Sequence, residues 1–242
     1  MTKDEFLELK KKHSYKNQYK VKDKRELKRL IKLAESIDIH MDLNWLDVSN
    51  IKNMNKLFQG SKFSGDISKW DVSNVKDMCC MFEDSEFNSD ISEWDVSNVK
   101  DMHSMFEESK FNGDVSKWNV SKVTDMCCMF NGSKFNGDVS NWDVSKVKDM
   151  CCMFYGTEVN SDLSKWNVSK VTNANNFNSY LDISDLQDLK NYISFLRAIY
   201  NDKPIDVNVK GAWFKTEGLP LHIANKLSED PNFVNEIRKV IC

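Results

Sequence analysis

Large apolar residues recur along the chain with a period of 24 residues. The tryptophans of this region lie 25 and then four times 24 residues apart, at Trp45, Trp70, Trp94, Trp118, Trp142 and Trp166. Two series of phenylalanines keep the same step: Phe58, Phe82, Phe106, Phe130 and Phe154, and Phe63, Phe87, Phe111 and Phe135. A fixed period of about 20–50 residues is typical of proteins in which each unit buries its apolar side against the next. The pattern therefore predicts a solenoid of stacked coils.

One repeat, residues 111–134, predicts two elements. Val115 is flanked by polar residues, as in a half-buried strand, and its equivalents at residues 66–68, 90–92, 138–140 and 162–164 would form a parallel ladder spaced at roughly 4.8 Å. Residues 123–130 predict one or two helical turns, and "NGSK" at residues 131–134 predicts a turn. On that helix Val123, Met126, Met129 and Phe130 share one face, with Cys127 on its flank and Cys128 opposite.

Strands stack about 5 Å apart, whereas helices need about 8–10 Å. A stack with strands on one side and helices on the other must therefore curve, with the strands inside. The predicted fold class is α/β: a right-handed leucine-rich-repeat-like solenoid with short parallel strands, short helices and helical caps at both ends.

The ends of the chain predict the caps. Thr2–Glu5 is a capping-box pattern, and Asp23–Glu26 opens a second helix with Leu27, Leu30, Ile31 and Ala34 on one face. The repeat pattern decays near Ala174, and helical signals follow, including the apolar stripe Leu186, Leu189, Ile193, Leu196 and Tyr200. We divide the chain into an N-terminal helical cap (1–42), a repeat region of about five to six coils (43–179) and a mainly helical C-terminal cap or small appended domain (180–242).

The segment "GDISKWDVSNVKDMCCMF" at residues 65–82 resembles the BspA-like family of bacterial surface-protein repeats. The resemblance extends over residues 43–178, and the lead-in before Trp45 is similar to the N-terminal cap of such proteins. It implies a leucine-rich-repeat-like fold and contact with other cells or host surfaces. The paired cysteines depart from the family pattern, which usually has a serine and a variable residue there.

Composition and charge argue against nucleic-acid binding and against insertion in a membrane. The formal net charge of −3 on 242 residues predicts no general attraction to nucleic acid. Residues 1–32 nevertheless carry twelve basic and five acidic residues, a surplus of +7 that is read as a solvated helical face in preference to an RNA-binding segment. The sequence has no apolar run long enough to span a membrane, and "MTKDEFLELKKKH" has no signal-peptide core. We expect a cytoplasmic or virion-associated protein; only the family resemblance implies an extracellular one.

Six of the seven cysteines lie in the repeats as adjacent pairs, Cys79/Cys80, Cys127/Cys128 and Cys151/Cys152. We interpret them as reduced thiols that fill space or face solvent, with metal binding, aided by His103, and redox use as alternatives. Adjacent cysteines rarely chelate one metal together. Stacked helices would place Cys128 and Cys152 about 8–10 Å apart, too far for a disulfide. On the same geometry Cys80, Cys128 and Cys152 face away from the core and are the more reactive thiols.

The sequence shows no phosphate loop, His-Glu zinc pair or nucleophile elbow, so we expect no enzyme, no catalytic residues, no cofactor and no metal. We predict a protein-binding or recognition module; a structural component of an assembly, such as a virion or surface structure, is the alternative. An enzyme with activity in residues 180–242, which contain His222, is the less favoured one. Positions that vary between repeats are Lys69/Glu93/Lys117/Asn141/Lys165, Lys62/Glu86/Lys110/Lys134/Glu158 and Gln59/Glu83/Glu107/Asn131/Tyr155.

Binding anchors are usually aromatic or Arg. The predicted binding residues are Tyr155, Tyr192, Arg197, Tyr200, Trp213 and Phe214. The expected partner is another protein or further subunits of an assembly.

Overall fold

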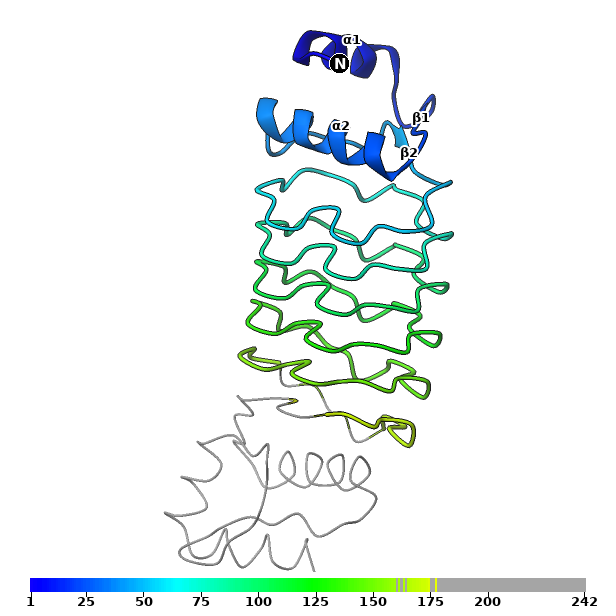
Figure 1. The fold of residues 1–242 in the computed structure, drawn as a ribbon, viewed down its shortest axis with the longest axis vertical. Helices are drawn as coiled ribbons and strands as arrows, with labels where there is room; N and C mark the ends of the chain where they lie inside the picture. Colours follow the sequence, from blue (N-terminus) through cyan, green and yellow to red (C-terminus); the bar gives the residue numbers. More distant parts are fainter. Residues whose placement is uncertain (160, 162, 164, 175–176, 178–242) are drawn as a thin grey trace, which may run out of the picture.

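The computed structural model describes residues 1–159, 161, 163, 165–174 and 177 (Figure 1). Its elements are α1 (Lys3–Lys12), β1 (Tyr19–Lys20), α2 (Lys24–Ile37) and β2 (Leu46–Asp47). The two strands form a small parallel sheet in which Tyr19 pairs with Leu46. The described part of the chain is therefore mixed α/β at most, with two helices and one short sheet.

Both N-terminal helices begin where the sequence predicts. The Thr2 hydroxyl accepts a hydrogen bond from the Glu5 N–H at 3.2 Å, and the Glu5 carboxylate accepts from the Thr2 N–H at 2.7 Å, so the capping box is formed. Asp23 caps α2 by accepting from the Glu26 N–H at 2.9 Å. The predicted apolar face of α2 is buried: Leu27, Leu30, Ile31 and Ala34. In Figure 1 α2 lies directly over the first repeat, so this face covers the end of the repeat core.

The repeats lie one below another, and backbone hydrogen bonds join residues one repeat apart (Figure 1). Parallel bridges connect equivalent positions in the order Asn53, Asp77, Asp101, Asp125, Asp149 and Asn173. Alternate N–H groups then continue the ladder: Met78 donates to the Asp101 carbonyl at 3.0 Å, and Phe82 to the Met105 carbonyl at 2.9 Å. The polar backbone of each repeat is thus satisfied largely by its neighbour, as in a sheet.

The helical turns predicted for residues 123–130 and their equivalents are wrong. The second residue of each cysteine pair has a left-handed backbone, with φ of 54° at Cys80 and 55° at Cys128, and Met129 N–H closes a tight turn on the Met126 carbonyl at 3.2 Å. A left-handed residue ends a right-handed helix. The segment is therefore a chain of turns whose outer N–H groups bond the next repeat.

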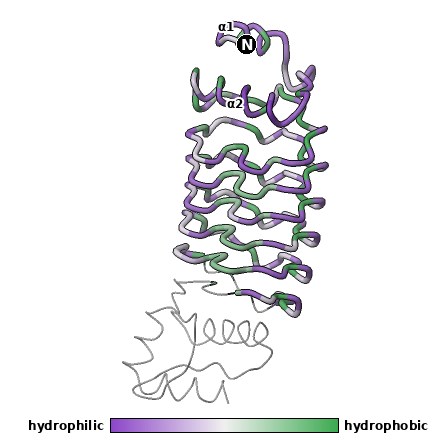
Figure 2. The backbone as a smooth tube through the Cα atoms, in the orientation of Figure 1, coloured by the Kyte–Doolittle hydropathy of each residue, from purple (hydrophilic) through white to green (hydrophobic). Residues whose placement is uncertain are grey.

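The predicted strands around Val115 are also wrong: among the described residues no strand or bridge lies at residues 114–116 or their equivalents. The parallel ladder runs instead through the segment that the apolar spacing assigned to a helix. The turn predicted at residues 131–134 is confirmed, with Gly132 at φ 64°. Figure 2 shows hydrophobic and hydrophilic residues alternating along each repeat, a pattern that suits turns as well as strands.

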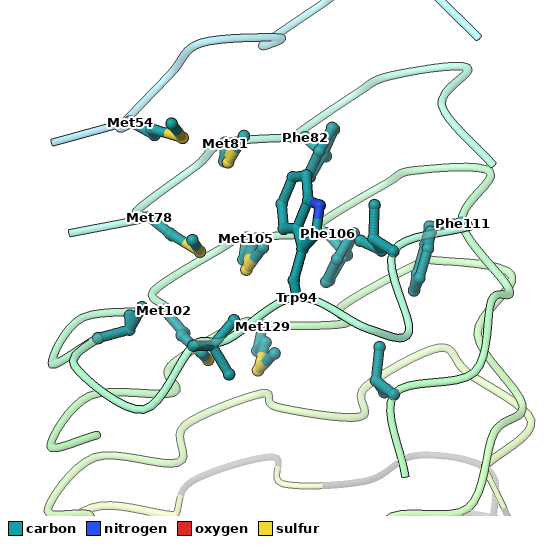
Figure 3. Close-up of a cluster of buried hydrophobic side chains, with 14 of the residues drawn as sticks. Met54, Met78, Met81, Phe82, Trp94, Met102, Met105, Phe106, Phe111 and Met129 are labelled. Carbon is teal, nitrogen blue, oxygen red and sulfur yellow. The ribbon is translucent and has the colours of Figure 1, made fainter. Parts of the chain in front are cut away.

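Columns of identical side chains fill the interior. Phe82 and Phe106 stack with centroids 5.4 Å apart and rings within 2° of parallel, and Phe106 and Phe130 stack at 5.5 Å. Figure 3 shows the methionines Met81, Met105 and Met129 following the same stacking beside these rings. The tryptophans of the repeats are 3–5% exposed, as expected if each repeat buries its apolar side against the next.

The tryptophans also tie the repeats together through their indole N–H groups. Trp94 Nε1 donates to the Ile67 carbonyl at 3.2 Å, and Trp118 Nε1 to the Ile91 carbonyl at 3.2 Å. Trp70, Trp142 and Trp166 make the equivalent bond to the preceding repeat. Trp45 lies in the first repeat, and its buried Nε1 has no hydrogen-bond partner in the described part of the chain.

Candidate functional site

A column of four carboxylates runs along the hydrogen-bonded edge of the repeats, at Asp77, Asp101, Asp125 and Asp149. One oxygen of each side chain accepts a hydrogen bond from the N–H two residues later, at 2.9–3.0 Å. This local turn is typical of Asp and Asn and fixes the direction of the side chain. Because the repeats are in register, the carboxylates stack at the spacing of a parallel sheet, about 4.8 Å.

Stacked carboxylates repel one another. At the two ends of the column the neighbouring residue is Asn, whose amide donates a hydrogen bond to the carboxylate. Asn53 Nδ2 donates to Asp77 Oδ2 at 2.6 Å, and Asn173 Nδ2 donates to Asp149 Oδ2 at 2.9 Å. In the middle, burial raises the pKa of Asp101, the His103 N–H opposes this, and the neighbouring Asp125 and Asp77 carboxylates add to the increase. Charge on Asp101, in the middle of the column, is therefore disfavoured, whereas the carboxylates next to the ends accept hydrogen bonds from neutral amides.

Two columns that contain thiols follow immediately. One holds Asn55, Cys79, His103, Cys127 and Cys151, and the other holds Lys56, Cys80, Ser104, Cys128 and Cys152. The sulfur atoms within the three pairs lie 3.3, 3.6 and 3.6 Å apart in chain order. The second cysteines were predicted to be the exposed ones; this is wrong for Cys80, which is only 7% exposed, whereas the other five are half-buried. The helix that would have placed all three second cysteines opposite the core is replaced by a left-handed turn.

The environment keeps these thiols protonated. Burial raises the pKa of Cys80 and Cys127 above the usual range, and it raises that of Cys151 to about 11. Contacts between neighbouring thiols, together with carboxylates such as Asp149, strengthen the effect at Cys127 and Cys151. A protonated thiol is a poor nucleophile, so this arrangement does not resemble the activated cysteine of an enzyme.

His103 occupies the thiol column in the third repeat. Its Nδ1 lies 4.0 Å from Asp125 Oδ1, and the two side chains are 40% and 41% exposed. Within the residues that the structure describes, no group of three or more His, Cys, Asp or Glu side chains is arranged to hold a metal ion.

Of the predicted binding residues, Tyr155 lies in the described chain, and its side chain is 47% exposed. It continues the outer column that contains Gln59, Glu83, Glu107 and Asn131. Side chains in this column contact their neighbours: Gln59 Nε2 donates to Glu83 at 2.9 Å, and Asn131 Nδ2 donates to Glu107 at 2.8 Å. The other predicted residues, Tyr192, Arg197, Tyr200, Trp213 and Phe214, lie outside the described residues, as does the predicted cap at 180–242.

The sequence analysis did not predict that the Asp residues of successive repeats, and likewise their Cys residues, lie next to one another. The signal was present, because Asp and Cys recur on the same period as Trp. A helix was assigned to this segment, and helices would have held these side chains about 8–10 Å apart. The glycines at Gly60, Gly132 and Gly156 adopt a left-handed conformation just after this segment, which suits the end of a helix as well as a turn.

Comparison with known proteins gives a family and little more. Neither helix of the described chain has the length and apolar character needed to cross a bilayer. No curated protein and no solved structure matches the chain. A family model matches residues 25–133 and again 107–192, which together span well over half of the 242 residues. The chain therefore belongs to the family described as Mycoplasma protein of unknown function, DUF285.

Proposed function

We propose that the chain is a non-enzymatic protein-binding module of the BspA-like repeat type, and that its repeats form one right-handed solenoid. The in-register backbone hydrogen bonds and the unbroken interior columns support the solenoid, because each repeat is completed by its neighbours. Right-handedness is the usual sense in which a chain returns to a parallel neighbour.

The observation that carries the binding function is the exposed aromatic side chain of Tyr155 at the end of an outer column, on a rigid core. Position by position the interior repeats Trp, Val, Met and Phe, whereas the outer column from Gln59 to Tyr155 changes at most steps. Lys117 and Glu93, at another variable position, pair at 3.7 Å on the surface. The invariant interior thus keeps the backbone rigid, and the variable outer column ends at Tyr155, which can serve as an anchor for a partner.

The partner docks mainly on residues 180–242 and on the coil around Tyr155. Tight binding is usually anchored by a few exposed aromatic or Arg side chains. The exposed large apolar residues of the described chain are Met1, Tyr15 and Ile39 in the N-terminal region and Tyr155 in the fifth repeat. The repeats between them offer no such anchor and act as a rigid spacer.

Capture from the native source, followed by mass spectrometry, tests the binding function. Deletion of residues 201–242 should abolish capture of the partner, and Tyr155→Ala should weaken it. Charge reversal at Lys69, Glu93 and Lys117 should leave capture intact, because the repeat surface is a spacer. Loss of capture only on charge reversal would move the site to the repeats. Recovery of the chain solely in purified particles would favour a structural component instead.

Removal of one whole repeat tests the solenoid separately. Deletion of residues 94–117 joins Glu93 to Trp118 and preserves the 24-residue register. The shortened chain should unfold cooperatively and keep its circular dichroism signal per residue. Deletion of residues 94–105 removes half a repeat, breaks the register and should prevent folding. If both deletions behave alike, the repeats do not stack as proposed.

A further inference from the structure

Four thiols gather on two adjacent repeats. Asp125 and Asp149 form a parallel bridge, and Cys128 N–H donates to the Cys151 carbonyl at 2.7 Å. The two cysteine pairs are therefore in register, with Cys127 beside Cys151 and Cys128 beside Cys152. This grouping arises from the stacking and is invisible in the spacing of cysteines along the chain.

The separation of these thiols suits a covalent link. Neighbouring parallel segments lie about 4.8 Å apart, inside the range of roughly 4.4–6.8 Å between Cα atoms that a disulfide needs. The Cys127 thiol lies close enough to Cys151 to affect its pKa, and the Cys152 thiol affects that of Cys128 in the same way. The distance of about 8–10 Å expected for stacked helices, which excluded a disulfide, does not apply here.

We propose that Cys127–Cys151 and Cys128–Cys152 are inter-repeat disulfide sites, oxidised by a low-molecular-weight disulfide such as oxidised glutathione. The thiolate of one cysteine attacks the small disulfide, forms a mixed disulfide and releases one glutathione thiolate. The facing thiolate then attacks the protein sulfur of that mixed disulfide and releases the second glutathione. Two protein thiols are oxidised, one glutathione disulfide is reduced, and the two protein protons end on the two glutathione thiols.

Links between repeats are favoured over links within a pair. Adjacent cysteines can join only by closing a small ring around one peptide bond, and here the second residue already holds a left-handed conformation, with φ of 55° at Cys128 and 52° at Cys152. A link across the ladder joins backbones that hydrogen bonds already hold in register.

The first cysteine pair provides an internal control. Lys56 N–H donates to the Cys79 carbonyl at 2.9 Å on one side, and Cys80 N–H donates to the His103 carbonyl at 2.8 Å on the other. The residues beside Cys79 and Cys80 are thus Asn55 and Lys56 in one neighbouring repeat and His103 and Ser104 in the other. Neither neighbouring repeat supplies a thiol, so this pair should stay reduced.

The experiment treats the full chain with oxidised glutathione, blocks the remaining thiols and digests with trypsin without reduction. Cleavage after Lys134 and Lys148 separates the two repeats, while each cysteine pair stays within one peptide. We expect the peptides that carry Cys127–Cys128 and Cys151–Cys152 to be joined to each other, with Cys79 and Cys80 alkylated. Oxidation of all three pairs alike, links confined within pairs, or no oxidation would overturn the proposal.

The rate gives a second readout. Because the Cys151 pKa is raised to about 11, the rate of linking should keep increasing as the pH rises from neutral toward that value. A rate that levels off at about pH 8.5, the pKa of an ordinary thiol, would show that other thiols react, and would contradict the assignment.

Two variants locate the link. Cys151→Ser with Cys152→Ser should leave Cys127 and Cys128 reduced under the same treatment. His103→Cys with Ser104→Cys fills the gap between the repeats and should join the first cysteine pair to the column. Melting curves under reducing conditions, compared with the unmodified chain, show that each variant is folded. A folded gap-filling variant whose two introduced thiols both stay alkylated would refute the register on which the proposal rests.

Discussion

Two columns with the same 24-residue register run through the repeats, one of phenylalanine inside and one of aspartate at the edge. Inside, Phe106 lies between Phe82 and Phe130 and gains contacts on both faces. At the edge, Asp101 lies between Asp77 and Asp125; burial raises its pKa, and these neighbouring carboxylates add to the increase. Repetition of one residue therefore adds favourable contacts in the core and adds repulsion at the edge.

The carboxylate column and the tryptophan column differ in how their end residues are hydrogen-bonded. The carboxylate column is closed by Asn53 and Asn173, whose amides donate to the terminal carboxylates. The tryptophan column has no such closure at its first member, since Trp45 Nε1 is buried without a hydrogen-bond partner among the described residues. The first repeat thus keeps a buried indole N–H without a partner. At both ends of the carboxylate column, by contrast, a neutral Asn stands where the other repeats have a charged Asp.

Removal of a ring from the middle of the aromatic column should have the largest effect. Phe106 is fully buried and also lies 4.2 Å, between centroids, from Phe111. Phe106→Ala should lower the free energy of unfolding by about 3–5 kcal/mol, measured by denaturant titration. Tyr155→Ala, at a side chain that is 47% exposed, is the control and should change it by less than about 0.5 kcal/mol. Similar losses in both variants would show that the interior column does not carry the stability.

The indole hydrogen bonds between repeats should give an intermediate effect. Trp118→Phe removes the donor to the Ile91 carbonyl, which keeps its bond from the Trp94 N–H. Trp45→Phe shortens an equally buried side chain whose donor is already unpaired. The first variant should therefore lose about 0.5–1.5 kcal/mol more stability than the second. Equal losses would mean that the inter-repeat bond contributes only through packing.

The smallest expected effect is an increase in the free energy of unfolding when one Asp of the carboxylate column is replaced. Asp101→Asn keeps the oxygen that accepts from the His103 N–H and reproduces the residue found at both ends of the column. Like charges on adjacent segments cost roughly 0.2–1 kcal/mol, and solvent screens this column, so a gain in the lower part of that range is expected at neutral pH.

The pH dependence gives the sign of this effect. The folded pKa of Asp101 is raised, so its charge opposes folding at neutral pH, and the penalty fades as the pH falls through the raised pKa. The gain from Asp101→Asn should fade with it. Asp95 is the control: hydrogen bonds from Ser97 lower its pKa, so its charge stabilises the fold above the normal carboxylate range, and this contribution is lost on acidification. Asp95→Asn should therefore lower stability slightly at neutral pH, and a gain in both variants would contradict the role of stacking.

Much of the architecture could be predicted because it depends on local or strictly periodic information. The capping box of α1 and the Asp23 cap of α2 each lie within four consecutive residues, and the buried face of α2 follows the helical period. The burial of the tryptophans follows from their spacing alone, since equivalent residues of stacked repeats must lie above one another. Of the candidate site, the sequence placed Tyr155 at the surface but could not show what lies beside it.

The conformation within each repeat was decided by the tertiary structure. The spacing of Val123, Met126 and Phe130 suits a helical face as well as a series of turns, so periodicity cannot distinguish them. Left-handed backbone at Cys128 costs about 1–2 kcal/mol, which an isolated segment would avoid. In the stack the same conformation lets Cys128 bond the Cys151 carbonyl at 2.7 Å, and that bond exists only once the next repeat is in place. The sequence thus determined which residues stack, whereas hydrogen bonding between repeats decided the turn conformation and brought the carboxylates and thiols into contact.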